Sequence, residues 1–94
     1  MSTEQTTLGP AKRRVALGQL DAFETRDFYL ACFLKCVGYE LADLRSEGRR
    51  RVFVFKDRPG RRGDVMAFYS NASSVRPLAF TATIKDMKAL IHNV

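Results

Sequence analysis

The sequence Arg-Val-Phe-Val-Phe-Lys, residues 51–56, decides the fold of this 94-residue chain. Side chains alternate between the two faces of a strand, so Val52 and Val54 share one face and Phe53 and Phe55 share the other. Both faces are therefore apolar, which is typical of a strand that is covered on both sides. We expect this segment to be the central strand of a small sheet.

The residues before this strand predict a β-hairpin. Residues 39–44 form a second short run, and Ser46, Glu47 and Gly48 form a polar spacer that contains the glycine favoured in reversing turns. Two strands alone are marginal in water, so a third strand is required. Residues 20–25, a later segment or a second copy of the chain in a homodimer are the three possible sources, and the sequence leaves them open.

Three further segments predict helices. Thr25 is placed to cap a helix over residues 26–37 that is apolar on nearly every side, and Gly38 is suited to end it. Asp64 is placed to cap a second, short helix that follows an exposed loop over residues 57–63. The last helix follows Pro77 and has an apolar stripe at positions i, i+4, i+7 and i+11, formed by Phe80, Ile84, Met87 and Ile91.

These elements predict an α+β fold. Its sheet is antiparallel, based on the hairpin, has two or three strands and packs against about three helices, in the order (β)-α-β-β-α-α. Residues 19–94 are expected to form a single domain, because a chain of this length builds one modest core. Residues 1–18 are mostly polar and are expected to form a mobile basic tail that carries Lys12, Arg13 and Arg14.

Charge and hydrophobicity indicate which partners and which cellular location to expect. The formal net charge is +6, which favours polyanionic partners, of which nucleic acid is the commonest. The densest apolar run, residues 28–34, is too short to span a bilayer, and the N-terminal region has no apolar signal-peptide core. We therefore expect a cytoplasmic protein without a membrane partner. Cys32 and Cys36, four residues apart on one predicted helix, are a poor fit to disulfide geometry and are expected to be reduced core residues.

The order of these segments resembles a small family of bacterial and bacteriophage proteins that is catalogued only as a domain of unknown function. The resemblance covers roughly residues 23–92 and rests on Thr25-Arg26-Asp27 before the first helix, on Leu30-Ala31 and Leu34 within it, on Gly38-Tyr39 after it, on the strand at 51–55, and on Val75, Pro77, Phe80 and Lys88. It implies the same architecture and a bacterial or mobile-element origin. The family brings no assigned activity, cofactor or catalytic residue.

No pattern in the sequence predicts catalysis, a metal site or a cofactor. A nucleophile needs an adjacent base, but the single histidine is His92, close to the C-terminal end of the last helix. Cys32, Cys36 and His92 are the whole supply of soft metal ligands. Gly60 and Gly63 lack the Gly-Lys-Ser/Thr ending of a phosphate-binding loop. We therefore expect a protein that is not an enzyme.

The remaining candidate site is a concentration of arginine. Seven of the sixteen basic residues lie within fourteen positions, at the two ends of the central strand: Arg49, Arg50, Arg51, Lys56, Arg58, Arg61 and Arg62. Guanidinium groups bind phosphate bidentately and provide affinity without reading sequence. A six-residue strand spans ~20 Å, so these residues are expected to form two patches.

Two functions and one simpler explanation fit this pattern. The first function is a non-enzymatic nucleic-acid-binding accessory protein that uses these arginines together with Lys12, Arg13 and Arg14. The second is a protein-interaction or inhibitor module that binds an acidic protein surface. The simpler explanation is that arginines keep strand edges soluble, and that Asp57 and Asp64 partly neutralise the loop by pairing with its arginines.

Overall fold

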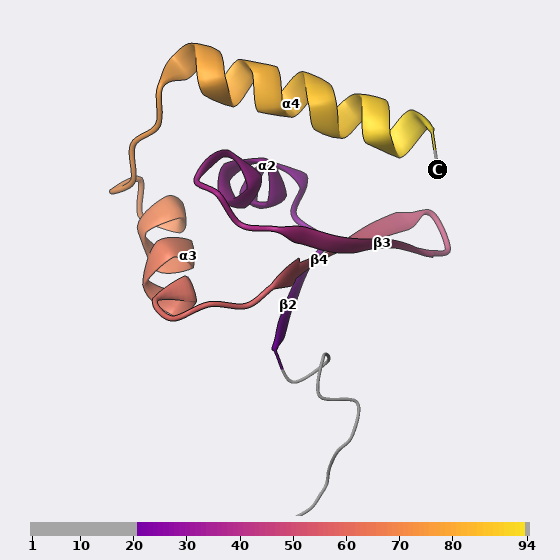
Figure 1. Ribbon diagram of the computed structural model, residues 1–94, viewed down its shortest axis with the longest axis horizontal. Helices are drawn as coiled ribbons and strands as arrows, with labels where there is room; N and C mark the ends of the chain where they lie inside the picture. Colours follow the sequence, from indigo (N-terminus) through magenta and orange to yellow (C-terminus); the bar gives the residue numbers. More distant parts are fainter. Residues whose placement is uncertain (1–20, 94) are drawn as a thin grey trace, which may run out of the picture.

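The computed structural model describes residues 21–93 and confirms the predicted α+β class (Figure 1). Three strands form one antiparallel sheet, and three helices accompany it in the order β-α-β-β-α-α. The elements are β2 (Ala22–Thr25), α2 (Phe28–Cys36), β3 (Leu41–Glu47), β4 (Arg50–Lys56), α3 (Arg61–Tyr69) and α4 (Pro77–His92). The predicted tail over residues 1–18 lies outside the described residues.

The central position of β4 is confirmed. The strand order is β2-β4-β3, so β4 pairs on both sides, and the third strand comes from the segment at residues 20–25. All four residues from Val52 to Phe55 are buried, as expected for a strand covered on both faces. Phe53 and Phe55 belong to the main core cluster, which they share with α2.

The hairpin is longer and its turn is tighter than predicted. β3 begins at Leu41 and continues to Glu47, which pairs with Arg50, so Ser46 and Glu47 belong to the strand and not to a spacer. The turn consists of Gly48 and Arg49 alone, with Gly48 at φ 62°. A two-residue turn of this kind requires a left-handed residue that glycine supplies, and it lets the strands pair up to their ends.

The predicted start of α2 is wrong by two residues. Asp27 caps the helix by accepting hydrogen bonds from the backbone N–H groups of Tyr29 (3.0 Å) and Leu30 (3.1 Å). Thr25 instead ends β2, where it pairs with Phe53. Both residue types are good caps, and the pairing of Thr25 in the sheet leaves Asp27 as the first residue free to cap. The central position of α2 is confirmed, since residues 30–34 are all buried.

The predicted start of α3 is also wrong. The helix begins at Arg61 after Gly60, which has φ 86°, so Arg61, Arg62 and Gly63 are helical and the loop is shorter than expected. Asp64 does not cap the helix. It lies in the first turn, where its negative charge complements the helix dipole.

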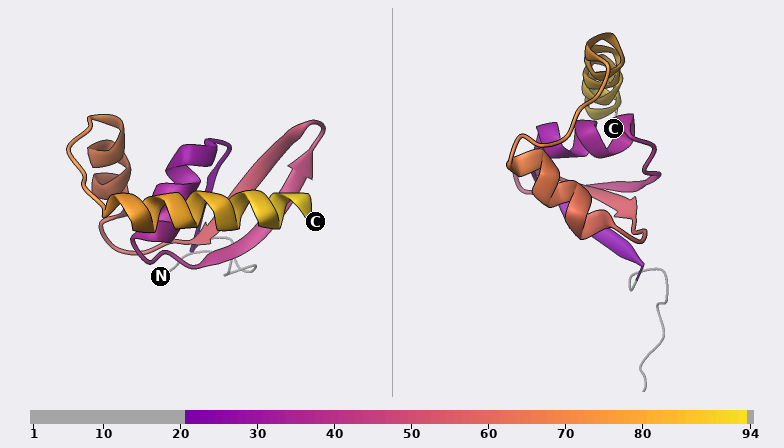
Figure 2. Two further views of the ribbon diagram at one scale, coloured as in Figure 1. Left: turned by 90° about the horizontal axis from the view of Figure 1, so that it is seen from above. Right: turned by 90° about the vertical axis from the view of Figure 1, so that its left-hand side faces the viewer.

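The predicted stripe of α4 is confirmed, and α4 begins at Pro77. Met87 is buried, and Phe80, Ile84 and Ile91 pack partly buried against the core. Figures 1 and 2 show α2 lying between α4 and the sheet, so α4 covers the side of α2 that faces away from the strands. Cys32 and Cys36 are free thiols, and burial raises the pKa of Cys32 to about 11. Cys32 is thus a reduced core residue as predicted, and Cys36 is half-buried.

Candidate functional site

The hairpin tip holds three consecutive arginines, Arg49, Arg50 and Arg51. Arg49 lies in the turn, and Arg50 and Arg51 begin β4, where they pair with Glu47 and Ser46 of β3. Arg49 and Arg50 are exposed, and Arg51 is half-buried and donates a hydrogen bond to Ser46 Oγ at 2.6 Å. Within residues 21–93, no carboxylate forms a salt bridge with any of the three. Their charge is therefore available to a ligand.

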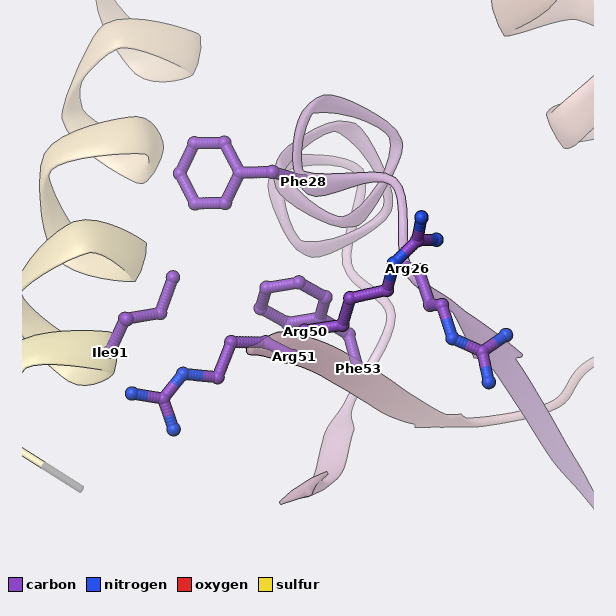
Figure 3. Close-up of a pocket in the computed structure, with 6 residues that line it drawn as sticks. All are labelled: Arg26, Phe28, Arg50, Arg51, Phe53 and Ile91. Atoms are coloured by element: carbon purple, nitrogen blue, oxygen red, sulfur yellow. The ribbon is translucent and has the colours of Figure 1, made fainter. Parts of the chain in front are cut away.

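A groove opens beside this tip. Its volume is about 400 Å³, and it lies between the tip, the start of α2 and the end of α4 (Figure 3). We call it the tip groove, and it is lined by Arg26, Phe28, Arg50, Arg51, Phe53 and Ile91. In Figure 3 the guanidinium groups of Arg50 and Arg51 extend to opposite sides of the Phe53 ring. The groove therefore combines apolar walls with a cationic rim.

The aromatic residues of the tip groove differ in exposure. Phe53 is 2% exposed and belongs to the core. Phe28 is half-buried, with its ring centroid 6.1 Å from that of Phe53 and 5.3 Å from that of Tyr29. The Phe28 ring projects from α2 toward α4, on the side of the groove that Ile91 closes (Figure 3). Phe28 is therefore the aromatic ring that a bound group can contact.

Acidic residues near the tip are already paired with other arginines. Glu47, which stands opposite Arg50 in the sheet, pairs with Arg26 and, at 3.3 Å, with Arg45. Hydrogen bonds from Arg26 and then Arg45 hold the pKa of Glu47 below its usual value. Arg45 also binds Glu24 through two hydrogen bonds of 2.8 and 2.9 Å. The carboxylates on this face of the sheet thus leave the charge of Arg50 unpaired.

The loop arginines at the other end of β4 have structural contacts. The guanidinium of Arg58 stacks 3.9 Å from the ring centroid of Tyr39, and that of Arg61 lies 4.4 Å from the ring centroid of Phe23. Arg61 also pairs with Asp57 at 3.1 Å, as the sequence suggested, and its hydrogen bond holds the pKa of Asp57 below the usual range. These contacts hold the loop against the sheet.

The other predicted residues of the basic patches are less constrained. Lys56 and Arg62 are exposed, and neither forms a salt bridge within the described part of the chain. Asp64 does not pair with a loop arginine, and instead accepts a hydrogen bond of 2.6 Å from the buried Tyr39 hydroxyl. Lys12, Arg13 and Arg14 lie outside the described residues. The structure thus divides the predicted arginines into two groups. Those of the tip form no salt bridge with a described residue, whereas Arg58 and Arg61 of the loop contact aromatic rings or a carboxylate.

Sequence reasoning missed four members of the tip groove: Arg26, Phe28, Phe53 and Ile91. Ile91 was recognised only as part of the α4 stripe, and Phe28 only as part of the apolar run in α2. They meet because α4 returns across α2, a placement that no local pattern encodes. Among residues 21–93, no group of three potential ligands is close enough to hold a metal ion. None of the helices described is both long enough and apolar enough to cross a membrane.

Comparison with known proteins identifies a family for this chain. The model of a family described as Domain of unknown function (DUF5659) matches residues 21–93, which include every described element. No curated protein and no solved structure matches the chain. The match agrees with the resemblance in the sequence and assigns no activity.

Proposed function

The chain belongs to this family of unknown function, and we propose that it is a non-enzymatic nucleic-acid-binding accessory protein that contacts the phosphate backbone through its hairpin tip. The observation that carries the proposal is the unpaired charge of Arg49, Arg50 and Arg51 on a tightly paired hairpin. The proposal includes a cytoplasmic location and a bacterial or bacteriophage origin.

The chemistry of the tip supports contact with phosphate. A guanidinium presents donors in a planar fork that matches two phosphate oxygens, and it stays charged at all physiological pH values. Three of them at one turn release several counterions when they bind a polyanion, and this release drives affinity without reading base sequence. The exposed side chains of Lys56 and Arg62 add charge at the far end of β4.

A fluorescence-polarisation titration tests the proposal. The whole chain is titrated against labelled DNA and RNA oligonucleotides at ~50 mM and ~200 mM salt, because counterion release makes binding fall steeply with salt. We expect binding at the lower concentration and a clear loss at the higher one. Absence of binding to every oligonucleotide at ~50 mM salt would contradict the proposal.

A module that binds an acidic protein is the second candidate function. The observation that favours it is the combination of arginine and aromatic side chains in the tip groove, two residue types enriched at the centres of protein interfaces. Affinity purification with and without nuclease separates the two candidates. One stoichiometric protein partner that persists after nuclease treatment would favour this second function.

A further inference from the structure

We propose that the tip groove receives one unstacked nucleobase, so that the protein prefers single-stranded nucleic acid to duplex. The inference rests on the proposed function and specifies its ligand. The arrangement that carries it is the half-buried ring of Phe28 in an apolar groove whose rim holds Arg50 and Arg51.

The two parts of this site match the two parts of a nucleotide. Phosphate contact requires only the exposed guanidinium groups at the rim, and an apolar cavity beside them adds nothing to it. A nucleobase presents an apolar π-face that an aromatic side chain can stack on, and this interaction tolerates any base. The distribution of charge and apolar surface in the groove therefore fits a nucleotide better than a phosphate alone.

The size and position of the groove fit one base. Its volume of about 400 Å³ lies near the lower end of the range for small-molecule pockets. The bases of a duplex are stacked on each other and cannot enter such a groove without unpairing, whereas those of a single strand can. Arg50 and Arg51 extend to either side of the groove, where the phosphates that flank an inserted base would lie (Figure 3).

The wall composition indicates a preference for strands without strong sequence specificity. The six lining residues include no carboxylate and no amide side chain, so they lack the acceptors that read the amino groups of adenine and cytosine. Guanidinium groups also stack on bases and aromatic rings, which adds attraction that is equally tolerant of sequence. Attachment to a strand supplies neighbouring phosphates for Arg49, and a free mononucleotide lacks them.

The first test changes the ligand and leaves the protein intact. Wild-type affinity is measured by fluorescence polarisation for a single strand, for the same strand with alternate bases replaced by abasic sites, and for the duplex of equal length. We expect the intact single strand to bind at least about fivefold more tightly than the abasic strand. Fivefold is the lower end of the affinity loss expected when one base–aromatic stack is removed. A mononucleotide is included as a competitor and should not displace the strand at equal phosphate concentration.

The second test changes the ring. Phe28→Leu keeps an apolar side chain but removes the π-face, and should weaken single-strand binding about fivefold while leaving duplex binding unchanged. Phe68→Leu is the matched control, because Phe68 is also a half-buried phenylalanine packed against the core but lies on α3, outside the groove. Circular dichroism and thermal melting verify that both variants fold.

The outcomes separate the inference from the proposed function. Equal affinity for the intact strand, the abasic strand and the duplex would overturn the inference and leave the phosphate contacts of the tip standing. Displacement by the mononucleotide would also overturn it, since the groove would then be a site for free nucleotides. Absence of binding to every nucleic acid would instead remove the proposed function itself, and binding of an acidic protein partner in the groove would replace it with the second candidate.

Discussion

The two ends of β4 carry the same residue type in different roles. At one end, Arg49 in the turn and Arg50 at the start of β4 are exposed and form no salt bridge with any described residue. At the other end, Arg58 stacks on Tyr39, and Arg61 stacks on Phe23 while pairing with Asp57. A cluster of arginines in a sequence therefore does not define one patch, because some of its members already contact aromatic rings from other parts of the chain or, in the case of Arg61, a carboxylate of the same loop.

The difference follows from what surrounds each end. Among the described residues, no arginine of the tip stacks on an aromatic ring, and the acidic cross-strand neighbour of the tip, Glu47, pairs with Arg26 and Arg45 instead. The loop crosses the part of the core where Tyr39 and Phe23 present ring faces. Cation–π contacts there stabilise the connection from β4 to α3. Structural arginines and arginines available to a ligand are thus separated by the length of one strand.

Neutralising the tip should give the largest effect on binding. Replacing Arg49, Arg50 and Arg51 by glutamine should weaken single-strand binding at least about tenfold at ~50 mM salt and lower the salt slope by about 2, since each phosphate contact contributes ~0.7 on a single strand. Fluorescence polarisation at several salt concentrations measures both quantities. The unfolding midpoint in urea should stay close to that of the wild type.

The matched control for this variant has the same change in net charge at another place. Lys35, Arg76 and Lys85 are exposed and lie in the last turn of α2, at the N-cap of α4 and on α4, so their replacement by glutamine removes three charges from residues that do not line the tip groove. An equal loss of affinity in the two triple variants would show that net charge alone drives binding and that the tip is not a site.

Removing the loop arginines should reverse this pattern. The double variant Arg58→Ala and Arg61→Ala loses two ring contacts and the pair with Asp57, and should lower the free energy of unfolding by about 1–2 kcal/mol. Urea denaturation measures this loss, and single-strand affinity should change by less than the loss in the tip variant. Arg62→Ala is the control, because Arg62 is exposed on the same helix, and should stay within about 0.5 kcal/mol of the wild type.

The sequence predicted the parts of this comparison that depend on local pattern. The alternating residues of β4 indicated a central strand, the apolar run of α2 indicated a buried helix, and the stripe of α4 indicated its packed face. The predicted separation of the arginines into two ends also followed from strand length alone. These features depend on neighbours in the sequence, which is why they could be read without a structure.

The difference between the unpaired arginines of the tip and the loop arginines that stack on rings could not be predicted in this way. Arg58 meets Tyr39 across 19 positions and Arg61 meets Phe23 across 38, and nothing local to the loop marks either ring as a partner. The tip groove likewise joins Phe28 to Ile91 from opposite ends of the domain. The wrong start of α2 had a simpler cause, since Thr25 and Asp27 were both able to cap the helix and the pairing of Thr25 in the sheet decided between them.

The Tyr39 hydroxyl allows a test with a smaller expected effect, which measures how much its hydrogen bond stabilises the loop end of β4. This buried group donates to Asp64 in the first turn of α3, at 2.6 Å. Tyr39→Phe keeps the ring under Arg58 and should cost about 1 kcal/mol of stability, the net worth of one hydrogen bond, with the remaining Asp64 carboxylate free to reach water. Urea denaturation measures the cost. Tyr69→Phe removes a similar bond of 2.7 Å to Asp27 from an exposed tyrosine, and a loss as large as that of Tyr39→Phe would contradict the role assigned to burial.

The pH dependence of stability gives the smallest effect and distinguishes the two ends through Asp57. The hydrogen bond from Arg61 depresses the pKa of Asp57 in the folded protein, so the pair stabilises the fold at pH values above the ordinary aspartate pKa of about 3.9. That stabilisation is lost as the pH falls below this value and through the lower folded pKa, because the unfolded chain binds the proton first. Urea midpoints measured between pH 6 and pH 2.5 should therefore fall less steeply in Arg61→Ala than in the wild type. The tip triple variant should follow the wild-type profile, since its arginines pair with no described carboxylate, and a flattened profile in that variant would show that the tip also depends on an acidic partner.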